Sequence, residues 1–237
     1  MNVNADFAVT YVKKNKNLLI KKFADPSFFP SEKNPLSIFM AGAPGAGKTE
    51  FSENIVKVFA RKYSKRFVHI DADRIKEWIP GYNGRNATLY HGASALGVEK
   101  LYDYSTQKGQ NIIMDGTFAD YEKSKKNIER SLKKRRHTEI YYLFQDPAAS
   151  WAFTKRREAV TGRRIPAGAF VRSFLLSWEN VDKIKREFGK AVVLNVIVKN
   201  LNTGLDKYKL NVDSVYPHVR VRYTENDLKN IVKKTSL

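Results

Sequence analysis

The chain has 237 residues, of which 42% are hydrophobic and 28% charged, a composition typical of a soluble globular protein with one α/β domain and an extension. It has no cysteine, which excludes disulfides and thiolate metal sites, and no apolar run long enough to span a bilayer. Its 43 basic and 24 acidic residues give a net charge of +19, which favours polyanionic partners such as nucleotides or nucleic acid. Because no basic region followed by an apolar core opens the chain, we expect a cytoplasmic protein without a signal peptide or a membrane partner.

Residues 1–35 are predicted to form a helical extension. The segment from Phe7 to Phe23 places apolar residues among lysines in an amphipathic pattern, and three prolines then punctuate a connector that ends at Pro35. We expect a helix packed on the outside of the domain. Covering a site and contacting a partner protein are both roles that this pattern leaves open.

A phosphate-binding loop is the strongest motif, and it lies between a strand expected over Leu36–Ala41 and a helix expected over Glu50–Tyr63. It matches G-x-x-x-x-G-K-[ST] and consists of Gly42, Ala43, Pro44, Gly45, Ala46, Gly47, Lys48 and Thr49. Its glycines let the backbone approach a β-phosphate, and the next helix points its positive end at the same place. Lys48 would reach the β- and γ-phosphates, and the Thr49 hydroxyl would bind Mg²⁺. The motif therefore predicts binding of a nucleoside triphosphate with Mg²⁺.

A second strand, expected over Arg66–Asp73, ends in two acids. Asp71 and Asp73 stand two positions apart, so on a strand they would point to the same face, at the sheet edge where open α/β folds bind ligands. A small-molecule kinase needs such a pair, since one carboxylate orients Mg²⁺ and the other takes the proton from the attacking hydroxyl. The alternative is a solvated turn in which Asp73 caps a helix that starts at Arg74.

A third strand is expected over Gln110–Asp115, an apolar run that ends in an acid and is followed at once by a turn. Asp115 would either complete the Mg²⁺ shell or hold substrate. The turn-rich loop Pro80–Gly84 and a helix over Ser94–Gln107 precede this strand, and we expect this region to form one wall of the substrate site.

The rest of the chain continues to alternate helices and strands, which are expected over residues 121–135, 139–144, 166–188 and 191–198. This order predicts an α/β fold with a mainly parallel sheet. Residues 199–237 are expected to be an addition, with strands over 208–212 and 219–223 and a short terminal helix. The basic run Lys133–Arg136 is interpreted as a solvated helix end, and the four histidines, His91 among them, show no metal-binding spacing.

The most distinctive later stretch is Thr154–Pro166, which carries two basic clusters. These are Lys155, Arg156 and Arg157, and then Arg163 and Arg164 after Gly162. Guanidinium groups stabilise a transferring phosphoryl group with forked hydrogen bonds, so the stretch is predicted to be an arginine-bearing lid that closes over ATP. A basic surface helix followed by a turn is the alternative interpretation.

Taken together, these motifs resemble the zeta-toxin family of P-loop kinases. The resemblance covers residues 36–198 and is carried by Gly42–Thr49, Ile70–Asp73, Asp115–Thr117 and Thr161–Pro166. It implies a three-layer α/β/α fold and an enzyme that uses ATP and Mg²⁺ to phosphorylate the 3′-hydroxyl of the sugar in UDP-N-acetylglucosamine. Members of the family poison cell-wall synthesis and are often restrained by an antitoxin protein.

The resemblance also implies roles for individual residues. Asp73 would be the general base, and Arg156 and Arg163 would contact the γ-phosphate. The other implied roles are phosphate binding by Lys48, metal binding by Thr49 and Asp71, substrate contact by Asp71, Asp115 and Thr117, and an alternative γ-phosphate contact by Arg157 and Arg164.

Two positions depart from the family pattern. Asp115 stands where the family has a glutamate, and Ala119 where it has an arginine. Both changes fall on the side of the site that holds the sugar nucleotide, so the acceptor is less firmly predicted than the reaction. A P-loop kinase that acts on another nucleotide or on a nucleic-acid 5′-hydroxyl is one alternative. A non-catalytic, ATP-dependent binding module for protein or nucleic acid is the other.

Overall fold

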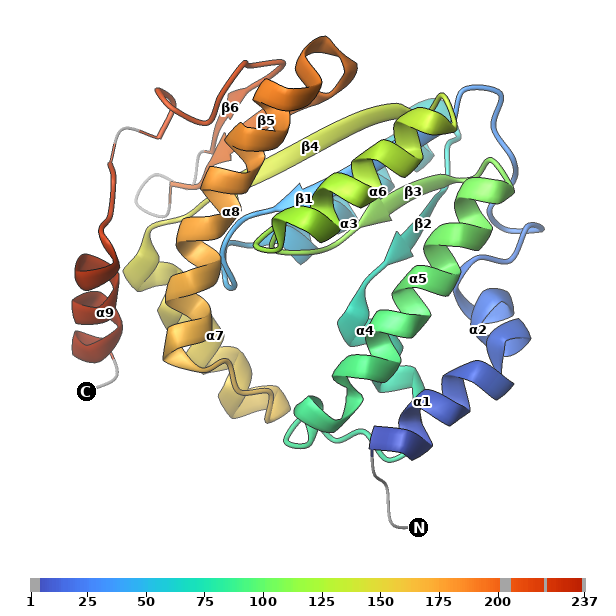
Figure 1. The fold of residues 1–237 in the computed structure, drawn as a ribbon, viewed down its shortest axis with the longest axis horizontal. Helices are drawn as coiled ribbons and strands as arrows, with labels where there is room; N and C mark the ends of the chain where they lie inside the picture. Colours follow the sequence, from blue (N-terminus) through green and yellow to red (C-terminus); the bar gives the residue numbers. More distant parts are fainter. Residues whose placement is uncertain (1–4, 201–205, 220, 236–237) are drawn as a thin grey trace.

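In a computed structural model, which describes residues 5–200, 206–219 and 221–235, one six-stranded sheet forms the centre of the molecule (Figure 1). Its strands, in the spatial order β2-β3-β1-β4-β5-β6, are β1 (Leu36–Ala41), β2 (Phe67–Ile70), β3 (Asn111–Met114), β4 (His137–Phe144), β5 (Val193–Val198) and β6 (Lys207–Lys209). The pairs among β1 to β5 are parallel, and β6 pairs antiparallel with β5. The predicted mainly parallel sheet is confirmed.

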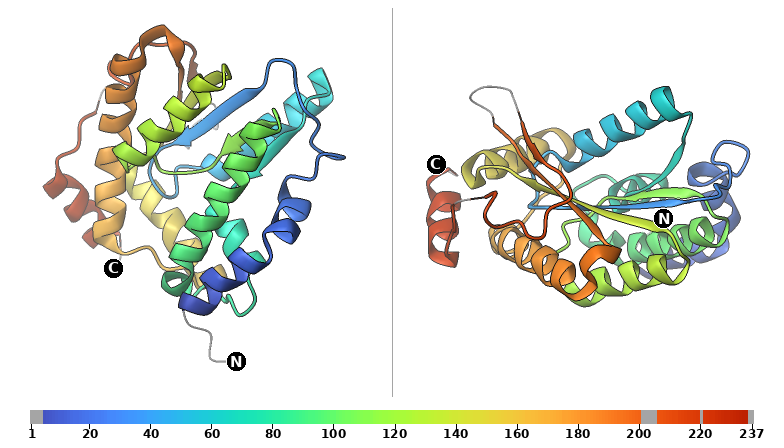
Figure 2. Two further views of the ribbon diagram at one scale, coloured as in Figure 1. Left: turned by 45° about the vertical axis from the view of Figure 1, so that its right-hand side comes forward. Right: turned by 90° about the horizontal axis from the view of Figure 1, so that it is seen from above.

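Helices cover both faces of this sheet, which gives the expected three layers (Figure 2). On one face, α3 (Lys48–Tyr63) packs its apolar side chains on Ile38 and Met40 of β1. On the other face lie α5 (His91–Gln107), α6 (Tyr121–Lys133) and α8 (Ala167–Phe188), over a larger cluster that includes Phe39. Because β1 is buried on both faces, its apolar residues point to both sides of the sheet and do not alternate with exposed polar ones.

The N-terminal extension forms two helices where one was expected, α1 (Ala5–Lys14) and α2 (Lys16–Phe23). The break falls at Asn15, whose side-chain amide donates to the Tyr11 carbonyl at 2.9 Å, a local bond of the kind that competes with regular helix. Both helices contact α5, and Ala8, Val12 and Leu19 are fully buried in the main core cluster.

The remaining helices are α4 (Ala72–Trp78), α7 (Pro147–Thr161), α9 (Glu225–Lys234) and the short 3₁₀ turns η1 (Ala87–Tyr90) and η2 (Gly189–Ala191). The predicted terminal helix is confirmed as α9, which starts at a capping box and packs on α7 and α8. No helix among the described residues combines the length and apolarity that crossing a membrane requires.

The C-terminal strands are shorter than predicted. The strand expected over 208–212 is β6, which ends at Lys209, and Val219 and residues 221–223 form no strand. The backbone turns here, with the N–H of Val219 donating to the Val215 carbonyl at 3.3 Å and both side chains buried. Residue 220 lies outside the described residues.

Arg136 departs from the prediction of a solvated basic run at the end of α6, whereas Lys133, Lys134 and Arg135 are exposed as expected. The helix ends at Lys133, and the chain then turns Arg136 inward until only 3% of the residue is exposed. Its Nε donates to Ser37 Oγ at 2.6 Å, and its Nη2 donates to the carbonyls of Leu36 (2.7 Å) and Gln110 (2.6 Å). Burial lowers the pKa of Arg136 to about 10. This side chain therefore ties the start of β1 to the segment that enters β3.

Replacing Arg136 with Met should lower the free energy of unfolding by about 2–4 kcal/mol, because two buried carbonyls and the Ser37 hydroxyl each lose the donor that Arg136 supplies. Urea unfolding followed by circular dichroism measures this difference. Arg135→Met is the matched control, since Arg135 is an exposed neighbour, and we expect a change below about 0.5 kcal/mol. Equal effects of the two substitutions would contradict the structural role of Arg136.

Candidate nucleotide and phosphoryl-transfer site

The phosphate loop connects β1 to the first turn of α3 and requires its glycines for steric reasons. Gly42, Gly45 and Gly47 all have positive φ angles (133°, 77° and 82°). A Cβ atom on Gly42 would lie 2.3 Å from the Leu143 carbonyl oxygen, and one on Gly45 would lie 2.1 Å from that of Ser150. The loop therefore packs closely against β4 and α7, and it lies at the N-terminus of the 16-residue helix α3, the positive end of the helix dipole.

Lys48 folds back over the phosphate loop. Its Nζ donates to the carbonyls of Gly42 at 3.0 Å and Ala43 at 2.8 Å. Burial lowers the pKa of Lys48 to about 8, although the nearby carboxylate of Asp115 acts in the opposite direction. Because the Lys48 ammonium already lies over the loop, a small movement of its side chain would exchange these carbonyl partners for phosphate oxygens.

The two acids after β2 do not leave the sheet side by side, contrary to the prediction. β2 ends at Ile70, and α4 begins at Ala72. Asp71 is the N-cap of α4, and its carboxylate accepts the backbone N–H of Asp73 at 2.8 Å. The alternative prediction, a cap at Asp73, is wrong by two residues. Because Asp73 lies inside the first helical turn, the two carboxylates belong to separate clusters.

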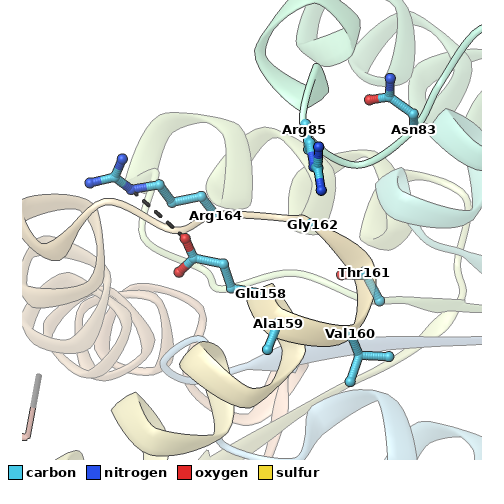
Figure 3. Close-up of a pocket in the computed structure, with 8 residues that line it drawn as sticks. All are labelled: Asn83, Arg85, Glu158, Ala159, Val160, Thr161, Gly162 and Arg164. Carbon is cyan, nitrogen blue, oxygen red and sulfur yellow. Dashed lines mark ion pairs between the residues drawn. The ribbon is translucent and has the colours of Figure 1, made fainter.

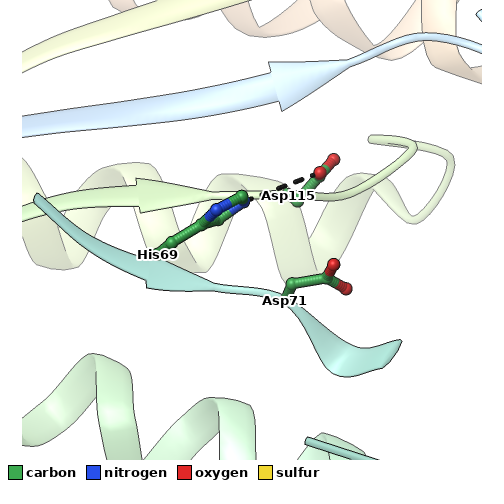
Figure 4. A group of neighbouring side chains, drawn as sticks. All are labelled: His69, Asp71 and Asp115. Atoms are coloured by element: carbon green, nitrogen blue, oxygen red, sulfur yellow. Dashed lines mark ion pairs between the residues drawn. The ribbon is translucent and has the colours of Figure 1, made fainter. Parts of the chain in front are cut away.

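The first cluster joins His69, Asp71 and Asp115, whose ligand atoms all lie within 4.8 Å of one another (Figure 4). β2 and β3 are neighbouring parallel strands in register, so the ends of both strands bring these side chains together. Asp115 Oδ2 accepts the Thr49 hydroxyl at 3.0 Å and lies 3.7 Å from His69 Nε2. Thr49, the predicted metal-binding hydroxyl, thus contacts the acid at the end of β3.

The electrostatics of this cluster favour a bound cation. Burial raises the pKa of Asp71, and the negative charges of Asp115 and Asp73 add to that effect. Burial would also raise the pKa of Asp115, but interactions with His69, Lys48 and Thr49 outweigh it and hold that pKa below its usual range. Two carboxylates and a hydroxyl are the hard oxygen donors that Mg²⁺ prefers, so the residues present fit this ion.

His69 belongs to this cluster although the spacing of the four histidines predicts no metal site. Its position two residues before Asp71, whose backbone is still extended, places the two side chains on one face, and this spacing was the available signal. The other signal, proximity to Asp115, depends on the pairing of β2 with β3.

The second cluster surrounds Asp73, whose side chain is 14% exposed. Oδ1 lies 3.3 Å from the Nζ of Lys76. Oδ2 accepts hydrogen bonds from Arg163 Nη1 and from Arg157 Nη2, the latter at 3.4 Å. Arg157 comes from α7 and Arg163 from the segment after Gly162, which ends the helix with a φ of 72°. The arginine stretch thus closes over the acid that was predicted to be the base.

Arg156 and Arg164 lie elsewhere. The Arg156 guanidinium is 5.7 Å from the centre of the Phe153 ring. The Arg164 side chain is 79% exposed, with its Nε 4.0 Å from Glu158 Oε1 (Figure 3). The structure therefore brings Arg157 and Arg163 to Asp73. Of the two arginines first predicted to contact the γ-phosphate, Arg163 lies at Asp73 and Arg156 does not. The γ-phosphate roles of all four arginines stay predictions.

The predicted lid, Thr154–Pro166, rests against the loop that follows α4. A Cβ atom on Gly84 would lie 2.0 Å from the Thr161 carbonyl oxygen, so the two backbones touch. Beside this contact is a cavity of about 770 Å³ between the loop and the end of α7 (Figure 3). It is lined by Asn83, Arg85, Glu158, Ala159, Val160, Thr161, Gly162 and Arg164. The loop predicted to form a wall of the substrate site is thus joined to the lid.

The Gly-Thr segment after Asp115 is held from two sides. The N–H of Gly42 donates to the Thr117 carbonyl at 3.2 Å, and Asn180 Nδ2 donates to the Phe118 carbonyl at 2.9 Å. Phe118 has a φ of 65°, a conformation that costs a non-glycine residue about 1–3 kcal/mol and needs such support. Thr117, a predicted substrate residue, consequently lies next to the phosphate loop. Nothing in the sequence alone pointed to Asn180.

Comparison with solved structures shows the same fold elsewhere. A structure of the PezAT chromosomal toxin–antitoxin system of the human pathogen Streptococcus pneumoniae matches with a TM-score of 0.62 and 14% identity, over 99% of this chain and 96% of that one. The AvrRxo1-ORF1:AvrRxo1-ORF2 structure with sulphate ions matches with a TM-score of 0.65 and 10% identity, over 97% and 84% of the two chains. The corresponding structure with ATP has a TM-score of 0.63 and 10% identity, over 98% and 82%.

At the level of sequence, no curated protein matches the chain. A family model for zeta toxins matches residues 21–211. This span contains the phosphate loop, both acid clusters and the lid, and it extends beyond the 36–198 resemblance at both ends. Because the match covers most of its length, the chain belongs to the zeta-toxin family.

Proposed function

We propose that this protein is an ATP-dependent phosphotransferase that transfers the γ-phosphate of ATP to a sugar hydroxyl of UDP-N-acetylglucosamine or a related UDP-sugar. The observation that carries the proposal is the convergence of three parts at one sheet edge. These are the phosphate loop, the cluster of His69, Asp71 and Asp115 that Thr49 contacts, and the acid Asp73 with its two arginines. A binding module would need the first part but not the other two.

ATP would occupy the phosphate loop, with Lys48 moving from the loop carbonyls to the β- and γ-phosphates. Mg²⁺ would be held by Thr49 with Asp115 and Asp71, and when bound it would neutralise charge between these phosphates. A structural neighbour described with ATP supports this nucleotide. In this assignment Asp115 takes the metal-side role rather than the substrate contact implied by the family glutamate.

Asp73 would act as the general base. It would take the proton of the acceptor hydroxyl while that oxygen forms a bond to the γ-phosphorus and the bond to the β,γ-bridging oxygen breaks, which releases ADP. Arg157 and Arg163 already lie at Asp73, so a γ-phosphate placed beside it would meet their guanidinium groups. Their forked donors suit the equatorial oxygens of the transferring group.

The protein is further proposed to be the toxin of a toxin–antitoxin pair, because it shares its fold with a chain of the PezAT toxin–antitoxin system. The cavity between the lid and the loop after α4 would admit the acceptor, and Arg85 on its wall suits a diphosphate.

A mass-spectrometric acceptor screen tests the proposed function. The purified chain, ATP and Mg²⁺ are incubated with UDP-N-acetylglucosamine, other UDP-sugars, nucleotides and short oligonucleotides. We expect one added phosphate on a UDP-sugar and none with Lys48→Ala, which removes the phosphate-loop cation. Phosphate found only on an oligonucleotide or another nucleotide would keep the kinase and overturn the UDP-sugar. The absence of transfer to every acceptor would contradict the proposal and favour a binding module.

A further inference from the structure

Lys76 is one of two lysines that are fully buried among the described residues, with 3% of its surface exposed. It stands on α4, one helical turn after Asp73, and its Nζ lies 3.3 Å from Asp73 Oδ1. Lysine is almost never buried to this extent unless it is paired, because a desolvated ammonium needs a compensating charge. The carboxylate that supplies this charge is the acid proposed to be the general base.

The two oxygens of Asp73 have different partners. Oδ1 contacts Lys76, which lies on the same helix, while Oδ2 receives Arg157 and Arg163 from the lid. The arginine side chains are 46% and 24% exposed, and they come from α7 and the segment after it rather than from α4. The Lys76 side chain is 4% exposed, and the packing around it restricts its movement away from Asp73. Oδ1 therefore has a buried partner on its own helix, and Oδ2 has more exposed partners from another segment.

We propose that Lys76 is a positioning residue that holds Asp73 by Oδ1 and so presents Oδ2 to the acceptor hydroxyl. The inference rests on the proposed function of Asp73 as the base. When the γ-phosphate of ATP takes Arg157 and Arg163, Oδ2 loses its hydrogen-bond donors while Oδ1 keeps Lys76. The acceptor proton then passes to Oδ2, and the carboxylate does not rotate away because its other oxygen is fixed.

The test compares Lys76→Met with Lys185→Met by steady-state kinetics on the acceptor found in the screen. Lys185 is the other buried lysine, 5% exposed, and it donates to the carbonyls of Gly189 and Val192 at the end of α8. We expect Lys76→Met to lower kcat by about 10–100-fold with KM for ATP changed less than about threefold, because the base is misplaced rather than the nucleotide. Lys185→Met should lower the melting temperature and leave kcat within about twofold of the wild type.

A double-mutant comparison shows whether Lys76 acts through Asp73. In the Asp73→Asn background, adding Lys76→Met should cause no further loss of kcat, since the group that Lys76 positions is already disabled. A further loss of about tenfold would overturn the inference. Lys76→Gln, which keeps a neutral N–H donor, is the second variant if the Met variant does not fold, and we expect it to lower kcat by at least about fivefold.

The outcomes distinguish a failure of the positioning role from a failure of the proposed function. If Asp73→Asn retains full turnover, the proposed base is wrong and the role of Lys76 falls with it. If Asp73→Asn is inactive but folded Lys76→Met or Lys76→Gln turns over at the wild-type kcat, only the positioning role is overturned.

Discussion

Asp73→Asn is expected to lower kcat for phosphoryl transfer by about 10²–10⁴-fold while ATP still binds. The amide keeps the size of the side chain but cannot accept a proton, so the step that activates the acceptor hydroxyl is lost. ATP affinity should be unchanged or higher, because Arg157 and Arg163 no longer have a charged competitor for the γ-phosphate. Initial rates and calorimetric titration with ATP measure the two quantities separately.

Asp103→Asn is the matched control for this prediction. Asp103 is a surface residue of α5 with a side chain that is 67% exposed, and it pairs with Arg130 outside the site. Its substitution should leave kcat and ATP affinity within about twofold of the wild type. Full activity of Asp73→Asn, at wild-type ATP affinity, would remove Asp73 as the base.

The second large prediction concerns the four lid arginines. It distinguishes Arg157 from Arg156, and Arg163 from Arg164, by the effect of each on kcat. Arg157→Ala and Arg163→Ala should each lower kcat by about 10²–10³-fold, since an arginine on the transferring phosphoryl group contributes at least this much. Arg156→Ala and Arg164→Ala should change kcat by less than about threefold, because Arg156 lies against Phe153 and Arg164 is largely exposed. Single-turnover kinetics at saturating ATP measures the effect on the chemical step.

The four alanine variants also test the geometry of the lid. Arg163→Lys provides a further comparison, because it keeps the charge but lacks the forked donors, and we expect it to recover only part of the lost rate. A large loss for Arg156 with none for Arg157 would contradict the assignment. It would mean that α7 turns about its axis when ATP binds.

The strand–loop–helix unit around residues 36–63 could be predicted from the sequence because its signals are local. A mainly apolar run specifies a strand that is buried on both faces, and positive φ angles require glycine at Gly42, Gly45 and Gly47. The contact between Thr49 and Asp115 also follows from sequence logic, since parallel strands place their carboxyl ends at one edge.

What could not be predicted depends on helix boundaries or on packing between distant segments. The predicted strand runs three residues past Ile70 and places Asp71 and Asp73 on a common face, whereas in the structure an N-cap bond to Asp71 starts a helix there. Choosing Arg157 over Arg156 requires the rotational phase of α7, because neighbouring helix residues point about 100° apart. The burial of Arg136 depends on Ser37, which lies 99 residues earlier in the chain.

The structure of the protein with Mg²⁺ and a non-hydrolysable ATP analogue would test the central claim most directly, namely that the phosphate loop, the two acid clusters and the lid form one phosphoryl-transfer site. We predict the γ-phosphate between Lys48, Arg157 and Arg163, the metal ion on Thr49 and Asp115, and Asp73 still held by Lys76 with its Oδ2 facing the acceptor cavity. A γ-phosphate that is contacted by neither Arg157 nor Arg163, or a metal ion bound away from Thr49, would contradict this account.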